Sequence, residues 1–405
     1  MLLKIAWRNV WRNKRRSLIT IAAIFIAVLL AIFLRALQLG MYDNMINNVV
    51  GSYSGYVQLH SKGYWDDKTI DNAFEVNQSV LADIQNIDGV STILKRIQTG
   101  ALSSYNDLSK FVYITGIDPE NEEILTDWNK RLIEGRLLKK DSKSIIVAKG
   151  VAKYYNLKIG DTLIFIGQGY HGMQAVGAYP LQGVVDMKNP NLNNYSVFMT
   201  LPVAQDFVSA DNLITNLVID KEQYFDENKI AQAIKSKINN QSYDIMTWKE
   251  MTPELDQLIE ADNAGGILII MILYMIVTFG IFGTVLMMTQ ERLYEFGVLI
   301  SIGMRRSKLM ITLIYETILL TFTGIMSGVV VSLPIVNYFN YNPLRLWGAA
   351  EAQLESAGFE PVIPFMNSYD IPLTHSLIIL CISLIICVYP ILIIYQLHPI
   401  KAMKR

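Results

Sequence analysis

Long uninterrupted runs of apolar residues dominate the pattern along this chain. Four runs approach the roughly 20 residues that a helix needs to cross the ~30 Å hydrocarbon core of a bilayer. They cover residues 18–34, 264–289, 309–333 and 376–397, and the first can extend through Arg35 to Gly40. Because helices buried in soluble proteins are rarely so long and so apolar, the pattern predicts a membrane α-helical protein with four transmembrane helices.

The segment between the first and second apolar runs has a different pattern, in which apolar and polar residues alternate. Such alternation is typical of half-buried strands, and it occurs at residues 55–60, 91–98, 111–117, 144–148, 162–166, 195–201 and 213–219. Helical spacing occurs at 78–87, 150–156 and 225–238. The segment 41–263 is therefore predicted to form a large mixed α+β domain.

The positions of Lys and Arg predict the orientation. Basic residues gather in the first 17 residues, in the loop after the second run and in the C-terminal tail. The loop after the third run is instead acidic, with Arg345 against Glu351, Glu355, Glu360 and Asp370. Because basic loops stay in the cytoplasm, both termini are expected there and the α+β domain is expected outside.

The expected organisation follows from these patterns. An amphipathic elbow helix (1–17) precedes transmembrane helix 1 (18–40), the outer α+β domain (41–263) and transmembrane helix 2 (264–289). A charged cytoplasmic segment (290–308) leads to transmembrane helix 3 (309–335), an outer loop (336–373), transmembrane helix 4 (374–397) and a cytoplasmic tail (398–405). A cleaved signal peptide is the alternative for 18–34, but no small-x-small cleavage site follows it.

The first 17 residues have the pattern of a helix that lies at the membrane surface. Apolar residues recur at helical spacing beside the basic stripe of Lys4, Arg8 and Arg12. Each basic residue near anionic lipid contributes about 1 kcal/mol to binding. Orientation alone requires neither the tryptophans nor the asparagines, so we predict a docked elbow helix. Its assigned residues are Trp7, Arg8, Asn9, Trp11, Arg12 and Asn13.

The charged segment 290–308 lies between two apolar runs, which is typical of a short surface helix that bears on a partner. Phe296 and Leu299 are three residues apart and are predicted to form an apolar ridge on one face, near the acids Glu291 and Glu295. A glycine such as Gly303 allows close approach or a turn out of the helix.

This segment resembles a known signature. Glu291-Arg292, Glu295-Phe296-Gly297, Leu299 and Ile302-Gly303-Met304 are similar to ER-x-x-E-F/I-G-I/V-L-x-x-I/L-G of type VII ABC transporter permeases, the family of the lipoprotein-releasing Lol permeases, MacB and FtsX. The opening IAWRNVWRNKRRSLIT resembles the start of these permeases. Gly135-Arg136-Leu137 with Gly160-Asp161 resembles their periplasmic domain, and the tail His398-Pro399-Ile400-Lys401-Ala402 resembles their ending.

The resemblance implies a dimer of permeases, identical or paralogous, with two copies of a cytosolic ABC ATPase in a bacterial inner membrane. It implies that the ATPase is coupled through Glu291, Arg292, Glu295, Phe296, Gly297, Leu299 and Gly303. No G-x-x-x-x-G-K-S/T motif occurs, so ATP and Mg are expected on the partner, with no cofactor bound by this chain.

Catalytic chemistry is not expected. The outer segment has only His60 and His171, no cysteine, and no H-E-x-x-H or G-x-S-x-G motif. The two cysteines, Cys381 and Cys387, lie in the fourth run. The basic and aromatic residues are not patterned for nucleic acid, whereas membrane lipids are expected partners. We therefore expect a non-catalytic membrane subunit.

The long outer domain and the absence of a fused ATPase favour lipoprotein release, with lipoprotein cargo and a periplasmic carrier. Moving three acyl chains of ~15 methylenes into water costs on the order of 35 kcal/mol at ~0.8 kcal/mol per methylene, so cargo requires an apolar site. The predicted walls are the outer ends of spans 1 and 2, with Arg35 meeting a headgroup or snorkelling. The candidates are Arg35, Gln38, Leu39, Met41, Tyr42, Met45, Ile267, Ile270 and Met271.

Two other functions stay open: MacB-like efflux of drugs or peptides, and FtsX-like mechanotransmission that moves no substrate and regulates an envelope enzyme. A smaller outer domain would be expected for the second. Within the third span, Glu316 is predicted to have a structural partner such as Arg292 rather than to relay protons. Gly324-x-x-x-Gly328 in the same span predicts close helix contact.

Overall fold

The computed structural model describes the chain except residues 1, 188, 223–224, 239–241, 358–360 and 399–405. The predicted family-like tail motif therefore lies, apart from His398, outside the described residues. The chain divides into two compact units. The helical unit comprises Met1–Asp43, Leu258–Arg345 and Val362–Arg405, and the outer unit comprises Asn44–Gln257 and Leu346–Pro361. Each unit is described by itself.

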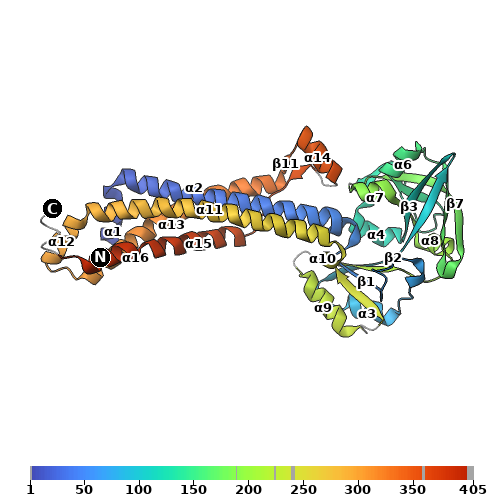
Figure 1. Cartoon of the computed structure of the whole chain (residues 1–405), viewed down its shortest axis with the longest axis horizontal. Coiled ribbons are helices and arrows are strands. Elements are labelled where there is room, and N and C mark those ends of the chain that lie inside the picture. The colour runs from blue at the N-terminus through green and yellow to red at the C-terminus, as the bar shows by residue number, and fades with distance from the viewer. Residues whose placement is uncertain (1, 188, 223–224, 239–241, 358–360, 399–405) are drawn as a thin grey trace. The chain divides into compact units, whose positions relative to one another are not determined.

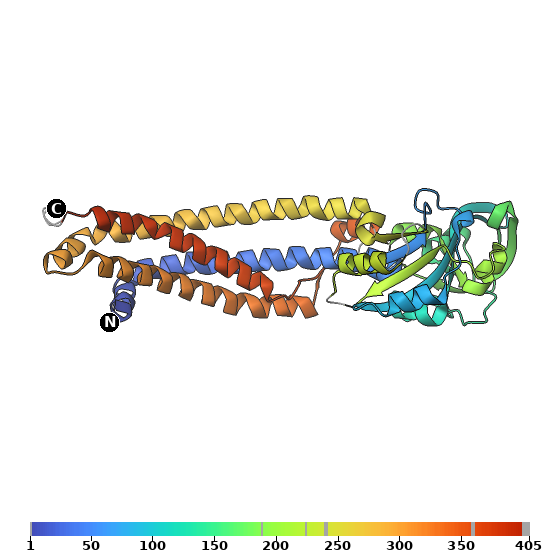
Figure 2. The same cartoon turned by 90° about the horizontal axis from the view of Figure 1, so that it is seen from below.

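The helical unit contains the helices that can span a membrane, running side by side in both views (Figures 1 and 2). Among the described residues, four helical stretches are long and apolar enough to cross: Lys14–Gly51, Pro253–Glu291, Arg306–Tyr341 and Asp370–Gln396. The elements are α1 (Leu2–Arg12), α2 (Lys14–Ile46), α11 (Pro253–Glu291), α12 (Leu293–Ser301), α13 (Arg306–Tyr341), α15 (Asp370–Ile386) and α16 (Val388–Gln396). A two-stranded ribbon, β11 (Leu344–Arg345) with β12 (Val362–Ile363), completes the unit.

The helices extend beyond the apolar runs that predicted them. The helix α11, for example, begins at Pro253, whereas its apolar run begins at 264. An apolar run reports the thickness of the hydrocarbon layer, but polar residues also propagate a helix, so the run alone cannot locate the helix ends. The elbow helix, in contrast, is shorter than the predicted 1–17. The helix α1 ends at Arg12, and Asn13 forms a turn before α2.

Glycines bring α13 against α2. A Cβ atom added to Gly324 would lie 2.7 Å from Cβ of Ile24, and one added to Gly328 would lie 2.8 Å from Cβ of Val28. Real side chains do not approach so closely, so only glycine permits this contact. The close helix contact predicted from the glycine spacing is confirmed.

The outer unit is a mixed α+β domain, as predicted. Its ten-stranded sheet has the order β10-β1-β9-β2-β3-β8-β5-β7-β4, with β6 pairing with β2 and β7. The strands are β1 (Val57–Ser61), β2 (Val90–Tyr105), β3 (Leu108–Ile117), β4 (Leu132–Gly135), β5 (Ile145–Ala148), β6 (Thr162–Gln168), β7 (Gln174–Val185), β8 (Ser196–Thr200), β9 (Asn216–Lys221) and β10 (Tyr243–Thr247). Most neighbours are antiparallel, but β3 with β8 and β5 with β7 are parallel.

Helices and short helical turns connect these strands or flank them in the outer unit. They are η1 (Asn47–Ser54), η2 (Ile70–Asn72), α3 (Gln78–Gln85), α4 (Pro119–Thr126), α5 (Trp128–Arg131), α6 (Lys149–Tyr155), η3 (Tyr170–Gly172), α7 (Pro190–Tyr195), α8 (Leu201–Phe207), α9 (Glu227–Lys237), α10 (Trp248–Met251) and α14 (Ala349–Ala357). Each predicted strand and helix is present with shifted ends. The strands β4, β7 and β10 were not predicted, and in β7 the residues Gly177, Pro180 and Gly183 interrupt the pattern.

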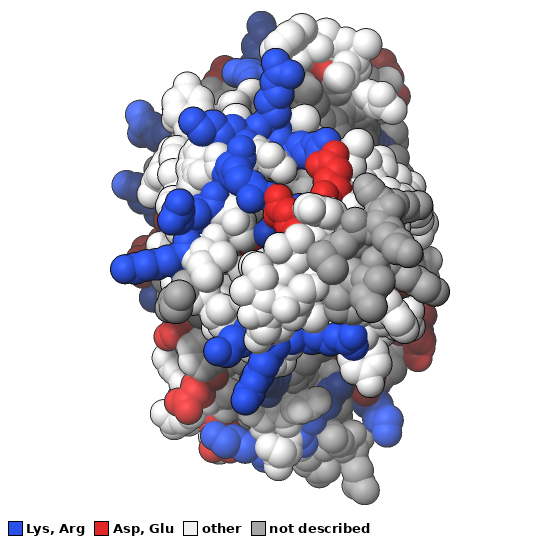
Figure 3. Space-filling model, turned by 90° about the vertical axis from the view of Figure 1, so that its left-hand side faces the viewer, with Lys and Arg blue, Asp and Glu red and all other residues white. Residues whose placement is uncertain are grey.

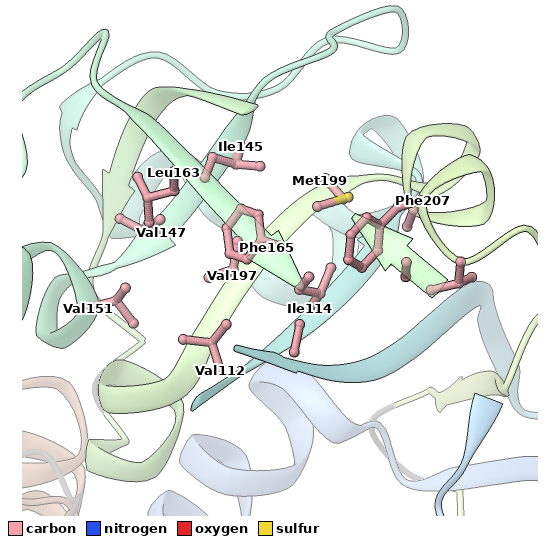
Figure 4. Packing of buried hydrophobic residues seen from close by; sticks show 14 of the residues in the cluster. Val112, Ile114, Ile145, Val147, Val151, Leu163, Phe165, Val197, Met199 and Phe207 are labelled. Carbon is pink, nitrogen blue, oxygen red and sulfur yellow. The ribbon is translucent and has the colours of Figure 1, made fainter. Parts of the chain in front are cut away.

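The main core of the outer unit is a cluster of buried apolar side chains from the strands of the sheet and the helices packed on it. Phe165 of β6, Val147 of β5 and Val112 of β3 are completely buried there, and Figure 4 shows them pointing toward one another. A second core joins β1, β9 and β10 to α3 and α9. These two cores explain why the domain folds although it holds no cysteine.

A buried ion pair anchors η1, the segment that follows α2 in the chain. Arg96 of β2 pairs with Glu122 of α4, and both side chains are 1% exposed. Arg96 also donates through an Nη atom to the carbonyl oxygen of Tyr53, at 2.5 Å. The Tyr53 hydroxyl in turn lies 3.0 Å from Oγ1 of Thr115 and accepts from Gln98 at 3.0 Å. The start of the outer unit is therefore tied to its sheet by charge and hydrogen bonds.

His60 of β1 predicts a pH dependence for this unit. The side chain is buried, its Nδ1 has no partner among the described residues, and burial lowers its pKa from 6.5 to about 4. Between pH 6.5 and about 4, His60 is protonated in the unfolded chain but stays neutral in the folded domain. Stability therefore falls as pH falls from about 6.5 to about 4, by up to ~3 kcal/mol.

The measurement is the free energy of unfolding of the outer domain in the full chain at pH 7 and pH 4.5. His60→Gln should flatten the dependence, whereas His171→Gln, at an exposed histidine, should leave it unchanged. Identical pH dependence in wild type and His60→Gln would contradict the assignment.

Candidate functional site

The candidate site is the junction of α1, α2, α12 and α13 within the helical unit. Each acid of the signature meets a basic side chain. Arg12 of α1 donates to both carboxylate oxygens of Glu295, at 2.6 and 2.8 Å. Arg16 of α2 pairs with Glu291, at the end of α11. The sequence placed Arg12 in the elbow and Glu295 in the charged segment, but it offered no sign that they meet.

The Arg12–Glu295 pair is charged at neutral pH. The hydrogen bonds from Arg12 lower the pKa of Glu295, and the same contact raises the pKa of Arg12. Both side chains remain substantially exposed. Because exposed ion pairs contribute little stability, we interpret this pair as fixing the orientation of α12 against α1.

Glu316 is the buried centre of the junction. Its carboxylate is 3% exposed, and each oxygen accepts a hydrogen bond, one from Nδ2 of Asn9 at 2.6 Å and one from Arg292 at 2.5 Å. The predicted pairing with Arg292 is confirmed. With both oxygens engaged, Glu316 acts as an anchor for α1 and α12 rather than as a free proton carrier.

The contribution of Asn9 could not be predicted in detail. The sequence assigned Asn9 and Asn13 to the elbow helix without partners. The backbone carbonyl of Asn13 accepts from the amides of Arg16 and Ser17, each at 3.1 Å, so Asn13 forms the turn between α1 and α2. Asn9 joins α1 to α13 through Glu316. One asparagine therefore shapes the turn and the other anchors the elbow.

The predicted ridge of Phe296 and Leu299 is wrong for Phe296. This side chain is completely buried and packs with Leu309, Leu313 and Ile394 of the same chain. The apolar face of a surface helix packs on its own protein first, because that burial removes it from water. Phe296 therefore anchors α12 and cannot itself touch a partner.

A different set of side chains is exposed along α12 and the turn after it. Tyr294, Leu299 and Ile302 are 56%, 38% and 79% exposed. Gly303 follows with φ of +101°, a left-handed conformation that favours glycine, which confirms the predicted turn out of the helix. Ile302 belongs to the signature, but its outward position could be found only from the structure.

Basic side chains surround this exposed edge. Arg305, Arg306 and Lys308 follow it in the chain, and Figure 3 shows Lys and Arg spread over this face with acids among them. Arg306 donates to the carbonyl oxygens of Tyr395 and Leu397, at 2.7 and 2.9 Å, and so ties the end of α16 to the start of α13.

The predicted cargo residues divide into two groups. Arg35, Gln38 and Tyr42 form a polar network with Asp262 and Asn263, which the sequence did not single out. Arg35 donates to Gln38 and to Asn263, each at 2.8 Å. Tyr42 donates to Asp262 at 2.6 Å and accepts from Gln38 at 2.7 Å. The network joins α2 to α11, so Arg35 has internal partners rather than being free for a headgroup.

The apolar candidates are also split. Ile267 and Met271 are exposed, Met41 and Met45 are half-buried, and Ile270 is buried against its own unit. The apolar wall at the outer ends of α2 and α11 stays a prediction. On α11, Ile267, Leu268 and Met271 face outward.

In the part of the chain that the structure describes, no group of three or more His, Cys, Asp or Glu side chains could hold a metal ion. The acids Glu291, Glu295 and Glu316 of the junction form ion pairs with Arg16, Arg12 and Arg292, and these pairs connect the helices.

In the described part of the chain, four helices able to span a membrane, a surface segment anchored between the second and third, and a large α+β domain define a multi-pass membrane protein. Residues 17–236 match the family model described as MacB-like periplasmic core domain, which is more than half of the chain. Residues 267–399 match the FtsX-like permease C-terminal model. The chain belongs to the MacB/FtsX superfamily of type VII ABC transporter permeases, inner-membrane proteins with a large periplasmic domain.

Two relatives have low sequence identity to this chain. An uncharacterized ABC transporter permease of Methanocaldococcus jannaschii, MJ1507, is 18% identical, covering 81% of this chain and 81% of its own. The macrolide export ATP-binding/permease protein MacB of Campylobacter jejuni is 20% identical, covering 83% of this chain and 53% of MacB. This chain thus spans about half the length of MacB.

Solved structures match the outer domain. The periplasmic region of MacB from Actinobacillus actinomycetemcomitans is 13% identical with a TM-score of 0.37, covering 54% of this chain and 98% of that one. The extracellular domain of the transporter YknZ from Gram-positive bacteria is 12% identical with a TM-score of 0.34, covering 48% of this chain and 100% of that one.

Proposed function

We propose that two copies of a separate cytosolic ABC ATPase drive this permease by docking on α12. The observation that carries the proposal is the exposed edge of Tyr294, Leu299 and Ile302 on a helix otherwise anchored in its own chain. Exposed apolar side chains on a charged surface are typical of a protein contact. ATP and Mg²⁺ are bound by the ATPase and not by this chain.

The ion pairs then carry the motion to the spanning helices. Arg12 of α1 bonds to Glu295 of α12, and Glu316 of α13 bonds to Arg292 at the start of α12. Arg16 of α2 bonds to Glu291, the last residue of α11. A force on α12 therefore acts directly on α1 and α13. This arrangement supports mechanotransmission by a pair of permeases, identical or paralogous, that moves the periplasmic domain.

For the cargo, we propose lipoproteins that are released from the inner membrane to a periplasmic carrier. The exposed apolar surface of α11 at Ile267, Leu268 and Met271 supports this substrate class, since acyl chains need an apolar site along the way. Similarity to MacB favours the second candidate, efflux of a small apolar compound or peptide. FtsX-like regulation of an envelope enzyme is the third.

Crosslinking tests the cargo. A photo-crosslinker at Ile267 is expected to capture triacylated lipoprotein in the inner membrane, with lower yield after ATP is added together with the ATPase. A crosslinker at Ile385, an exposed apolar residue of α15, is the lipid-facing control and should capture none.

Depletion of the permease separates the three candidates. Lipoprotein release predicts that outer-membrane lipoproteins accumulate in the inner membrane. Normal lipoprotein sorting with raised drug or peptide sensitivity would favour efflux instead. A cell-wall or division defect without either change would favour regulation of an envelope enzyme.

A further inference from the structure

A groove lies between the elbow helix α1 and the spanning helix α13, apart from the docking edge of α12. It has a volume of about 390 Å³ and is lined by Leu3, Lys4, Trp7, Arg8 and Leu319. The surface of the groove is almost entirely apolar, because Lys4 and Arg8 line it with their aliphatic stems. A ligand that fills the groove must therefore be apolar, and an anionic group on that ligand would be attracted to the charged ends of Lys4 and Arg8.

The two cations of the groove are free to bind such a ligand. Lys4, Arg8 and Arg12 repeat every four residues and share one side of α1. Arg12 is engaged by Glu295. Among the residues that the structure describes, neither Lys4 nor Arg8 has a carboxylate partner, and both are exposed.

The wall that carries them is held in place. On the opposite side of α1, Ala6 is completely buried and Val10 is 4% exposed. Asn9 bonds to Glu316, and the rings of Trp7 and Trp11 meet edge to face at 5.8 Å between centroids. The groove is therefore formed by a fixed helix face and does not depend on an isolated mobile segment.

We propose that this groove binds one anionic phospholipid of the cytoplasmic leaflet. Lys4 and Arg8 hold the phosphate, and Leu3, Trp7 and Leu319 contact the acyl chain. Basic residues and tryptophan at the membrane surface suit the headgroup layer. A free phosphate would leave the apolar lining exposed, and a zwitterionic lipid would weaken the attraction to the two cations.

Binding of the lipid holds the elbow helix against α13, beside the contacts that α1 makes with Glu295 and Glu316. The lipid thus becomes part of the junction. This inference concerns lipid binding alone and stands whether or not α12 docks an ATPase.

The test measures phosphatidylglycerol and phosphatidylcholine bound to the full-length permease by native mass spectrometry. Wild type should retain one phosphatidylglycerol. Lys4→Gln with Arg8→Gln should weaken that binding by about 30-fold, which corresponds to roughly 2 kcal/mol for two basic residues. Lys14→Gln with Arg15→Gln is the matched control, since it removes two exposed charges outside the groove and should bind as wild type does.

Two further measurements locate the acyl chain. Leu319→Trp, which fills the groove without changing charge, should also lose the phosphatidylglycerol. Inorganic phosphate at equal concentration should not displace the lipid. Equal loss in the Lys14/Arg15 control, unchanged binding after Lys4/Arg8 replacement, unchanged binding in Leu319→Trp, or displacement by phosphate would each overturn the proposal. The Lys4/Arg8 replacement is on the surface and keeps the test valid if Leu319→Trp fails to fold.

Discussion

Arg96→Met should destabilise the periplasmic domain more than any other single replacement considered for this protein. It removes the partner of Glu122, whose side chain is 1% exposed, and it leaves the carbonyl oxygen of Tyr53 without its donor. Breaking one side of a buried ion pair costs about 3–5 kcal/mol, because the remaining charge is uncompensated. The measurement is the free energy of unfolding of this domain in the full chain.

The double replacement Arg96→Met with Glu122→Leu is the decisive control. Replacing both members of a buried pair by apolar residues is often neutral or even stabilising. The double variant is therefore expected to recover most of the loss. If it is as unstable as Arg96→Met alone, the charge left on Glu122 is not the cause.

Arg292→Met should have the second large effect, in the helical unit. It leaves the buried carboxylate of Glu316 with Asn9 as its remaining hydrogen-bond donor, at a cost of about 3–5 kcal/mol. The thermal stability of the purified permease should fall. Stimulation of the partner ATPase should also fall, because α12 loses its buried ion pair with α13 and is left with the apolar packing of Phe296 against that helix.

Adding Glu316→Gln to Arg292→Met separates the two effects. The amide carries no charge and can still bond to Asn9, so most of the stability should return, while the ion pair between α12 and α13 stays broken. Recovery of stability without recovery of ATPase stimulation is the expected result. Recovery of both would show that the Arg292–Glu316 pair has only a structural role.

The spans and the strands were largely predictable, because each depends on a local repeat. Apolar runs predicted the spanning helices, and alternation predicted β2, β3 and β6. The strand β7 was not predicted because Gly177, Pro180 and Gly183 lie within it. Its position in the sheet depends on its pairing with β5 and β6 rather than on its own pattern.

The junction was predictable only in part. Glu316 is a lone acid within a span, so a basic partner had to exist, and Arg292 was close enough in sequence to propose. The pairs Arg12–Glu295 and Arg16–Glu291 join residues 283 and 275 positions apart, and no local pattern encodes such contacts. The burial of Phe296 was missed for the same reason, since the helical face alone does not say whether it meets its own chain or a partner.

The central claim is that α12 docks the ATPase through its exposed edge, and site-specific photo-crosslinking in the assembled complex tests it most directly. A crosslinker at Ile302, which is 79% exposed, should join the permease to the ATPase. One at Phe279, which is 68% exposed within the span of α11, should not. A complex that copurifies intact but gives no crosslink at Ile302, or an equal yield at Phe279, would contradict the account.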